Sequence, residues 1–228
     1  MSKHIYVINP NSLDSVTQRI DRALDPLRRP GGPEIHCVTT EKGPPGVQTQ
    51  EDVDRAGLLV GEKIIECEAA AARQGGQASA FVIACFSDPG LFCAREKTRV
   101  PVFGIAESGF LSAMSYGLKV GVISILAGSI PRHWRYFASM GVTDRLAADL
   151  PIGLGVEALE TSPDARKRLL DTGRRLVEEH GADVLLLGCA GMTDFRAMLE
   201  DEVQRPVIDP TLAATVMALG HTLLANPA

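Results

Sequence analysis

The chain has 228 residues, of which 45% are hydrophobic and 22% charged, the composition of an ordinary globular protein of one or two domains. Its net charge is −5, from 23 basic and 28 acidic side chains, and the basic residues form no dense cluster. This balance argues against nucleic acid or an anionic membrane as a partner. We expect no membrane-spanning helix and no signal peptide, and therefore a cytoplasmic protein with reduced thiols.

Five cysteines are the most informative residues, and their number is odd. No pair has CxxC spacing, and no histidine lies at metal-ligand spacing from a cysteine. A disulfide framework, a structural zinc site and a thioredoxin-type site are therefore not expected, and neither is a resident metal. The cysteines are Cys37, Cys67, Cys85, Cys93 and Cys189.

The first half of the chain alternates strand-like runs with helical spacing. Ser12 is placed to cap a helix, because apolar residues follow it at helical intervals as far as Leu24. Asp88 and Pro89 resemble the N-cap and the first residue of another helix. We expect strands over residues 4–8, 35–39, 80–84 and 101–105, and a long helix over 51–74.

The second half has the same alternation of elements. Helices are predicted to stop at Gly141 and Gly181, since glycine commonly follows a helix C-terminus. We expect strands over residues 120–124, 152–156, 184–188 and 206–209, and helices over 132–140, 163–180 and 211–225.

The two halves repeat one order of features. Cys85 ends one apolar run, and Cys189, 104 residues further along the chain, ends a second one. A strand that starts with Pro-Val begins 16 residues after Cys85, and a similar strand begins 17 residues after Cys189. This repeat predicts an α/β fold with two similar lobes that have parallel sheets. We place the lobes at residues 1–110 and 111–228, with the N-terminal helix free to cross over and the C-terminal helix free to pack on the first lobe.

Both repeated cysteines lie beyond the carboxyl ends of strands, where open α/β sheets bind ligands. Each precedes an expected helix N-terminus, which favours the thiolate. If the lobes face each other, one thiolate can remove a proton from a stereocentre while the opposing thiol protonates the other face. The carbon must adjoin a carbonyl, so that backbone N–H groups can hold the enolate. The pattern indicates racemisation of a small molecule without a cofactor.

The turns at these strand ends supply candidate contacts to the substrate. The candidate catalytic residues are Cys85 and Cys189, and the candidate substrate-binding residues are Asn9, Pro10, Asn11, Phe86, Ser87, Glu107, Ala190 and Gly191. The two asparagines have an alternative role in shaping their turn, and Glu107 in orienting its own. The other three cysteines are expected to pack in the protein. The histidines, His4, His36, His133, His180 and His221, are expected at the surface or in packing.

Four motifs surround these residues in order. They are Asn9-Pro10-Asn11, Cys85-Phe86-x-Asp88-Pro89-Gly90, Pro101-Val102-x-Gly104-Ile105-x-Glu107 and Gly188-Cys189-Ala190-Gly191-Met192. From about residue 4 to residue 224, the chain resembles the hydantoin racemase branch of the aspartate/glutamate racemase superfamily. The resemblance implies two Rossmann-like domains related by pseudo-twofold symmetry, with the active site between them. It also implies a homo-oligomer, a two-base mechanism with both cysteines, and a 5-substituted hydantoin or allantoin as substrate.

The sequence departs from the branch at two places. Ser87 stands where the branch usually has glycine, and Pro45-Gly46-Val47 follows Gly43-Pro44 where the branch usually has serine and isoleucine. This loop is expected to border the pocket for the substituent, so the departures bear on the substrate more than on the reaction. The alternatives are another racemase or a maleate-type cis–trans isomerase of the superfamily, and a non-catalytic binding protein. A binding protein has no need of two thiols at matching strand ends.

Overall fold

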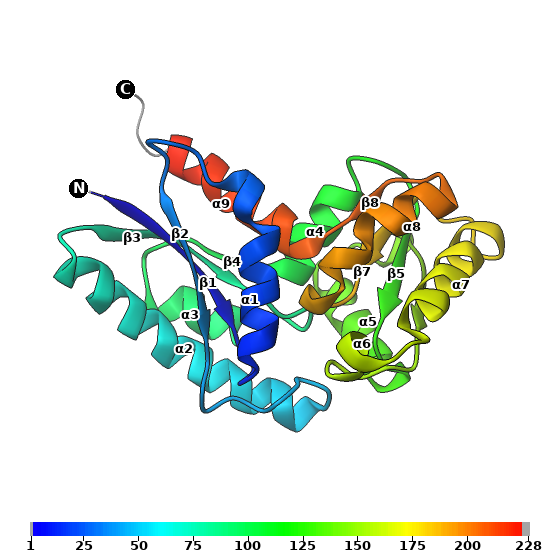
Figure 1. Cartoon of the computed structure of the whole chain (residues 1–228), viewed down its shortest axis with the longest axis horizontal. Coiled ribbons are helices and arrows are strands. Elements are labelled where there is room, and N and C mark those ends of the chain that lie inside the picture. The colour runs from blue at the N-terminus through cyan, green and yellow to red at the C-terminus, as the bar shows by residue number, and fades with distance from the viewer. Residues whose placement is uncertain (1, 225–228) are drawn as a thin grey trace. The chain divides into compact units, whose positions relative to one another are not determined.

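The computed structural model describes residues 2–224 and divides the chain into two compact units (Figure 1). The first unit comprises the chain up to Val47, residues Glu51–Ser108 and the segment from Thr211 onward. The second comprises Gln48–Gln50 and Gly109–Pro210. The helix expected at residues 211–225 therefore belongs to the first unit, and its last residue lies outside the described part of the chain.

The first unit is built on a four-stranded parallel sheet in the order β2-β1-β3-β4. The strand order turns back after β2, so right-handed crossovers place α1 and α2 on opposite faces, as Figure 1 shows. The strands are β1 (Lys3–Asn9), β2 (Glu34–Thr39), β3 (Gln77–Ile83) and β4 (Val102–Gly104). The helices are α1 (Asp14–Ala23), α2 (Gln50–Arg73), α3 (Leu91–Lys97) and α9 (Pro210–Leu224), with a 3-10 turn η1 (Asp25–Leu27). Helix α4 (Ile105–Ala113) begins in this unit and belongs to the second unit from Gly109 onward.

The second unit has the same sheet with later strands, in the order β6-β5-β7-β8, and all its pairs are parallel. The strands are β5 (Val120–Ser124), β6 (Leu146–Pro151), β7 (Val184–Leu187) and β8 (Val207–Ile208). The helices are α5 (Ile130–Ser139), α6 (Ala158–Thr161), α7 (Ala165–Glu178) and α8 (Arg196–Val203), with 3-10 turns η2 (Ala127–Ser129), η3 (Thr143–Arg145) and η4 (Ala190–Phe195). The matching order of strands confirms the predicted α/β fold with two similar lobes.

Burial on both faces explains why the central strands were visible in the sequence. All residues of β5 and β7 are buried, as are the last four of β3. Strands of this kind are almost continuously apolar, because helices cover both sides of a parallel sheet. The largest fully buried side chains of the cores are Ile5, Ile8, Ile20, Leu24, Ile64, Phe81, Ile83, Leu91 and Ile105 in the first unit and Phe110, Ile123 and Phe137 in the second.

The strand expected at residues 152–156 is wrong, and β6 lies earlier, at Leu146–Pro151. The expected run contains Gly153, whose φ of 71° belongs to a loop. The real strand contains Asp149, whose buried carboxylate interrupts the apolar pattern but is satisfied by hydrogen bonds inside the unit. The polar Asp149, buried with hydrogen-bond partners in the same unit, is why the apolar pattern did not predict the edge strand β6.

The start of α3 also differs from the prediction. Its N-cap is Gly90 in the left-handed conformation (φ 74°), not Asp88. Gly90 also packs against α2, since a Cβ there would lie 2.7 Å from the Cα of Gly57 and still closer to the Gly57 carbonyl oxygen.

Within residues 2–224, none of the helices combines the length and apolar character needed to cross a bilayer.

Replacing Gly90 by alanine is expected to lower the free energy of unfolding by more than about 2 kcal/mol, because it adds left-handed strain and a backbone clash. Gly220→Ala is the matched control, because a Cβ there meets none of the described atoms within 4 Å. Urea denaturation of both variants tests this, and equal midpoints would show that the α2 contact is not tight.

Candidate active site

Cys85 lies at the carboxyl edge of the first sheet, two residues beyond β3. The Ala84 N–H donates to the Ile8 carbonyl of β1 (2.8 Å), which extends the pairing to the edge. A turn follows, closed by the Asp88 N–H donating to the Cys85 carbonyl (2.9 Å). Phe86 is buried at the centre of this turn, whereas Cys85 and Ser87 are half-buried. The sheet thus holds the turn and its thiol at a fixed place.

Asp88 joins this turn to the beginning of α4. Its buried carboxylate accepts the N–H groups of Ala106 and Glu107, each at 2.9 Å. Gly104 makes room for the carboxylate, because a Cβ there would lie 2.6 Å from Oδ1 and closer to the other oxygen. A carboxylate at the first N–H groups of a helix is favoured by charge and by hydrogen bonding. Asp88 is therefore the cap of α4 rather than of α3.

Glu107 is engaged by a neighbouring helix. Its carboxylate accepts a hydrogen bond from the Arg95 guanidinium of α3 at 2.7 Å, and Arg95 also donates to the Val102 carbonyl at 3.1 Å. This pair connects α3, β4 and α4 beside the Cys85 turn. The geometry fits the orienting role of Glu107, while its contact with substrate stays a prediction.

The turn after β1 is shaped by its own asparagines. The Asn9 amide nitrogen donates to Asn11 Oδ1 (3.0 Å), to the Leu13 carbonyl (3.2 Å) and to Thr17 Oγ1 (3.0 Å). Asn11 Oδ1 also accepts the Leu13 N–H at 2.9 Å. Both side chains are buried. They hold the loop rigidly in place at the carboxyl edge, and the backbone around Pro10 forms the rim.

The loop after β2 packs directly on this turn. The Ser12 N–H donates to the Pro44 carbonyl at 3.0 Å, and a Cβ on Gly43 would lie 3.2 Å from the Asn11 Cα and overlap the Pro10 carbonyl. The buried Thr40 hydroxyl has no hydrogen-bond partner among the described residues. Nothing in the sequence singles out Thr40, because threonine at a strand end is ordinary.

Cys189 lies at the carboxyl edge of the second sheet, after β7. The preceding residue, Gly188, donates its N–H to the Ile123 carbonyl of β5 at 2.8 Å, and a Cβ there would lie 2.5 Å from that oxygen. Cys189 caps η4, since its Sγ accepts the Gly191 N–H at 3.4 Å. Ala190 and Gly191 are buried in the first turn of η4. A backbone N–H directed at sulfur favours the thiolate.

The two cysteines therefore differ in their local support. Cys189 directly precedes η4, as expected, whereas the turn around Asp88 separates Cys85 from α3, which begins only at Leu91. The helix N-terminus that Cys85 was expected to face is not adjacent to it. Cys85 belongs to the first unit and Cys189 to the second.

A buried polar cluster at the same edge of the second sheet was missed in the sequence. His133 Nδ1 lies 2.8 Å from Asp149 Oδ2 and 3.2 Å from the hydroxyl of Ser124, which donates to Asp149 Oδ1. All three residues are buried. Ser124 ends β5, the neighbour of β7, so the cluster shares a sheet edge with Cys189. The misplaced β6 hid it, because the strand expected at residues 152–156 left out Asp149.

Burial separates two other cysteines from acid–base chemistry. It raises the pKa of Cys37 and of Cys67 to about 12, from an ordinary value of 9. Such thiols stay protonated at neutral pH and behave as small hydrophobic residues. Cys93 is half-buried on α3. The five cysteines, all within the described residues, form no disulfide.

Known proteins share this architecture along almost the whole chain. The sequence matches the family described as Asp/Glu/Hydantoin racemase over residues 5–218. A hydantoin racemase from Pseudomonas sp. strain NS671 is 35% identical over 215 residues, which span 94% of this chain and 84% of that protein. The structure of allantoin racemase from Klebsiella pneumoniae has a TM-score of 0.88 at 32% identity, covering 98% of this chain and 88% of that one. Allantoin racemase from Pseudomonas fluorescens has a TM-score of 0.90 at 25% identity, with 97% and 92% covered.

The family match and the relatives named hydantoin and allantoin racemase place the chain among isomerases of the racemase class. The chain belongs to the Asp/Glu/Hydantoin racemase family. The resemblance stated from its four motifs is therefore confirmed. The roles of the individual site residues stay predictions.

Alkylation of the native protein with iodoacetamide at pH 8 should leave Cys37 and Cys67 almost unlabelled. A thiol of pKa 12 has about a thousandfold less thiolate than one of pKa 9, and the thiolate is the reacting form. Mass spectrometry of peptides measures the labelling, with the urea-unfolded chain as the control in which all five react. Equal labelling rates in the native protein would contradict the burial.

Replacing Asp88 by alanine should lower the free energy of unfolding by about 3 kcal/mol, because the buried Ala106 N–H and the partly buried Glu107 N–H lose a charged acceptor. Asp88→Asn should lower the free energy of unfolding by less, because its amide oxygen can still accept one of the two hydrogen bonds. Denaturant titration of both variants gives the comparison. An alanine variant as stable as the parent would rule out Asp88 as the cap of α4.

Proposed function

We propose that this chain racemises a 5-substituted hydantoin or allantoin, with Cys85 and Cys189 as the two bases. The observation that supports this most directly is topological. Each cysteine follows the third strand in the order of its sheet, β3 in one unit and β7 in the other. Relatives with this architecture are hydantoin and allantoin racemases.

The chemistry needs no group beyond the two thiols and the backbone. One thiolate takes the proton from C5, the electron pair moves into the neighbouring carbonyl as an enolate, and the opposing thiol returns a proton to the other face. The ring carbonyl and nitrogen next to C5 make this proton acidic enough for a thiolate. The Gly191 N–H, directed at Cys189 Sγ, supports the charged form of that residue.

The remaining site residues have positional roles in this proposal. The backbone N–H groups of Phe86 and Ser87, and that of Ala190, lie in the turns after the thiols and would stabilise the developing oxyanion, while Gly191 acts through its N–H to Cys189 Sγ. Asn9, Pro10, Asn11 and Glu107 would shape the rim that holds the ring. The proposal also includes a homo-oligomer in the cytoplasm, where the thiols stay reduced.

Replacing either Cys85 or Cys189 by serine should lower kcat for stereo-inversion by about 10²–10⁴-fold, the usual contribution of a general acid or base. The assay starts from one pure enantiomer of a 5-substituted hydantoin or allantoin in D₂O and follows optical rotation together with deuterium at C5. A variant with one cysteine is expected to exchange deuterium in one enantiomer only.

Cys93→Ser is the matched control, because this half-buried thiol lies on α3, outside the turns that follow β3 and β7, and should retain full activity. Complete inversion after loss of Cys85 or Cys189 would overturn the two-base mechanism. A parallel screen with aspartate, glutamate and maleate identifies the other reactions of the superfamily, and turnover of one of these alone would replace the proposed substrate.

A further inference from the structure

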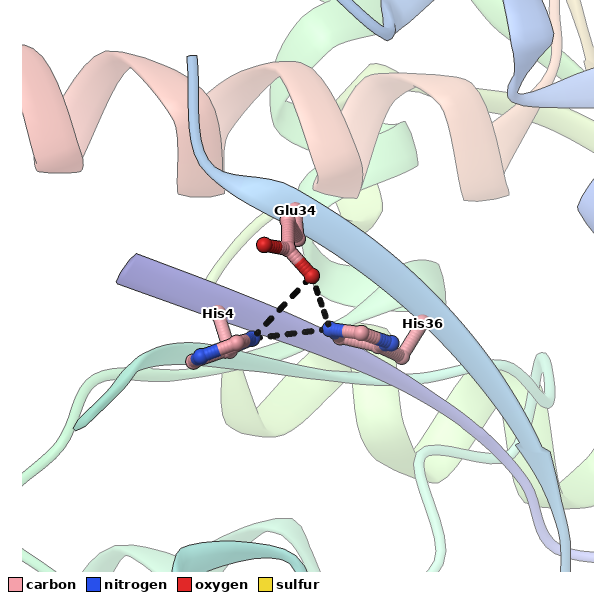
Figure 2. Close-up of side chains that lie close together, drawn as sticks. All are labelled: His4, Glu34 and His36. Carbon is pink, nitrogen blue, oxygen red and sulfur yellow. Dashed lines mark hydrogen bonds and ion pairs between the residues drawn. The ribbon is translucent and has the colours of Figure 1, made fainter. Parts of the chain in front are cut away.

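Three potential metal ligands meet at the amino edge of the first sheet, the edge opposite the Cys85 turn. His4 lies near the beginning of β1, and Glu34 and His36 lie at the beginning of β2. The parallel register pairs His4 with Glu34 and Tyr6 with His36. Residues two apart on a strand share a face, so all three side chains project from the same side of the sheet. Figure 2 shows them converging there.

The ligand atoms form a compact triangle. His4 Nδ1 is 2.8 Å from His36 Nε2, and Glu34 Oε2 is 3.8 Å from the first nitrogen and 3.5 Å from the second. Ligand atoms bound tetrahedrally to zinc at about 2.0–2.1 Å are about 3.3 Å from one another. Each side of the triangle is therefore within about half an ångström of one face of a zinc tetrahedron.

The His4 ring is fixed in the orientation that a ligand needs. It is 1% exposed, and its second nitrogen, Nε2, lies 2.9 Å from Ser2 Oγ. When Nε2–H donates to that hydroxyl, Nδ1 presents its lone pair to Glu34 and His36. Metal-binding histidines commonly have such a partner on the other nitrogen.

Two neighbours complete the support of the cluster. A Cβ on Gly76 would lie 2.7 Å from His4 Cδ2 and overlap Nε2, so only glycine leaves space for this ring. The His36 ring stacks on Tyr6, with centroids 5.1 Å apart and planes at 24°. The His4 and His36 rings are thus held by their neighbours Gly76 and Tyr6 as well as by the contact between the two rings.

A hydrogen bond between two neutral imidazoles is the simpler explanation of the 2.8 Å contact. It does not account for Glu34, whose side chain is 61% exposed and has water available, yet whose carboxylate lies within 4 Å of both ring nitrogens. Two imidazoles and one carboxylate are the ligand set of open zinc sites, in which solvent takes the fourth position. The exposed side of Glu34 and the half-buried His36 leave that position accessible.

We propose that His4, Glu34 and His36 bind one divalent transition-metal ion, with zinc as the best fit, and that the ion joins β1 to β2. The proposal is independent of the racemase proposal. Along β1, His4 is separated from Asn9 at the carboxyl edge by about 16 Å of strand. The ion is therefore expected to stabilise the first unit rather than take part in proton transfer.

The test is equilibrium binding of Zn²⁺ to the full chain, measured by competition with a chromophoric chelator after the accessible thiols have been blocked with iodoacetamide. The parent chain should bind one Zn²⁺ per chain at this site. His36→Gln and Glu34→Gln should weaken it by at least about 10–100-fold, since even the loss of an outer hydrogen-bond partner has that effect. Ser2→Ala should weaken it by about 10-fold through the orientation of His4.

Two controls make the result decisive. His180→Gln removes an exposed histidine of the second unit and should leave Zn²⁺ binding unchanged. His36 and Glu34 are partly exposed, and circular dichroism checks that their variants fold. Equal stoichiometry and affinity in the parent and in both variants would overturn the site. Racemase activity that is unchanged by chelator is expected whether or not the two-base mechanism holds, so the two proposals fail separately.

Discussion

Parallel strands all end at the same edge of their sheet, and the position of every candidate site residue depends on this constraint. Because β1, β2 and β3 run in one direction, the Asn9 turn, the loop at Gly43 and the Cys85 turn leave the sheet together. The same rule places Ser124 and Cys189 at one edge of the second sheet. Burial on both faces makes the central strands rigid, so the side chains that follow them start from fixed points.

Polar side chains at these edges then hold the turns in shape. Asp88 fastens the Cys85 turn to α4, and Asn9 fastens the turn after β1 to α1. In the second unit the thiol itself serves as the cap, through the Gly191 N–H. Two strand ends that are equivalent in topology thus support their cysteines by different local interactions.

The opposite edge of the first sheet has a different character. There His4, Glu34 and His36 come from adjacent parallel strands, and their contacts depend on the register of β1 and β2. A bound ion at this edge would add to the cohesion of strands whose other ends form the rim of the site. The stabilising metal site and the candidate active-site turns would then lie at opposite ends of the same strands.

The sequence alone was sufficient for the elements with strong apolar patterns, and it identified the repeat that pairs Cys85 with Cys189. It also separated these two from Cys67, whose helical spacing predicted burial. It misplaced β6, because Asp149 breaks the apolar pattern and its partners lie far away in the chain. It misread Asp88, because the N–H groups that this carboxylate accepts belong to residues 18 and 19 positions later. Local patterns reveal burial and helix spacing, whereas partners of polar groups and the register of strands exist only after the chain has folded. For that reason only the tertiary structure brought His4, Glu34 and His36 together.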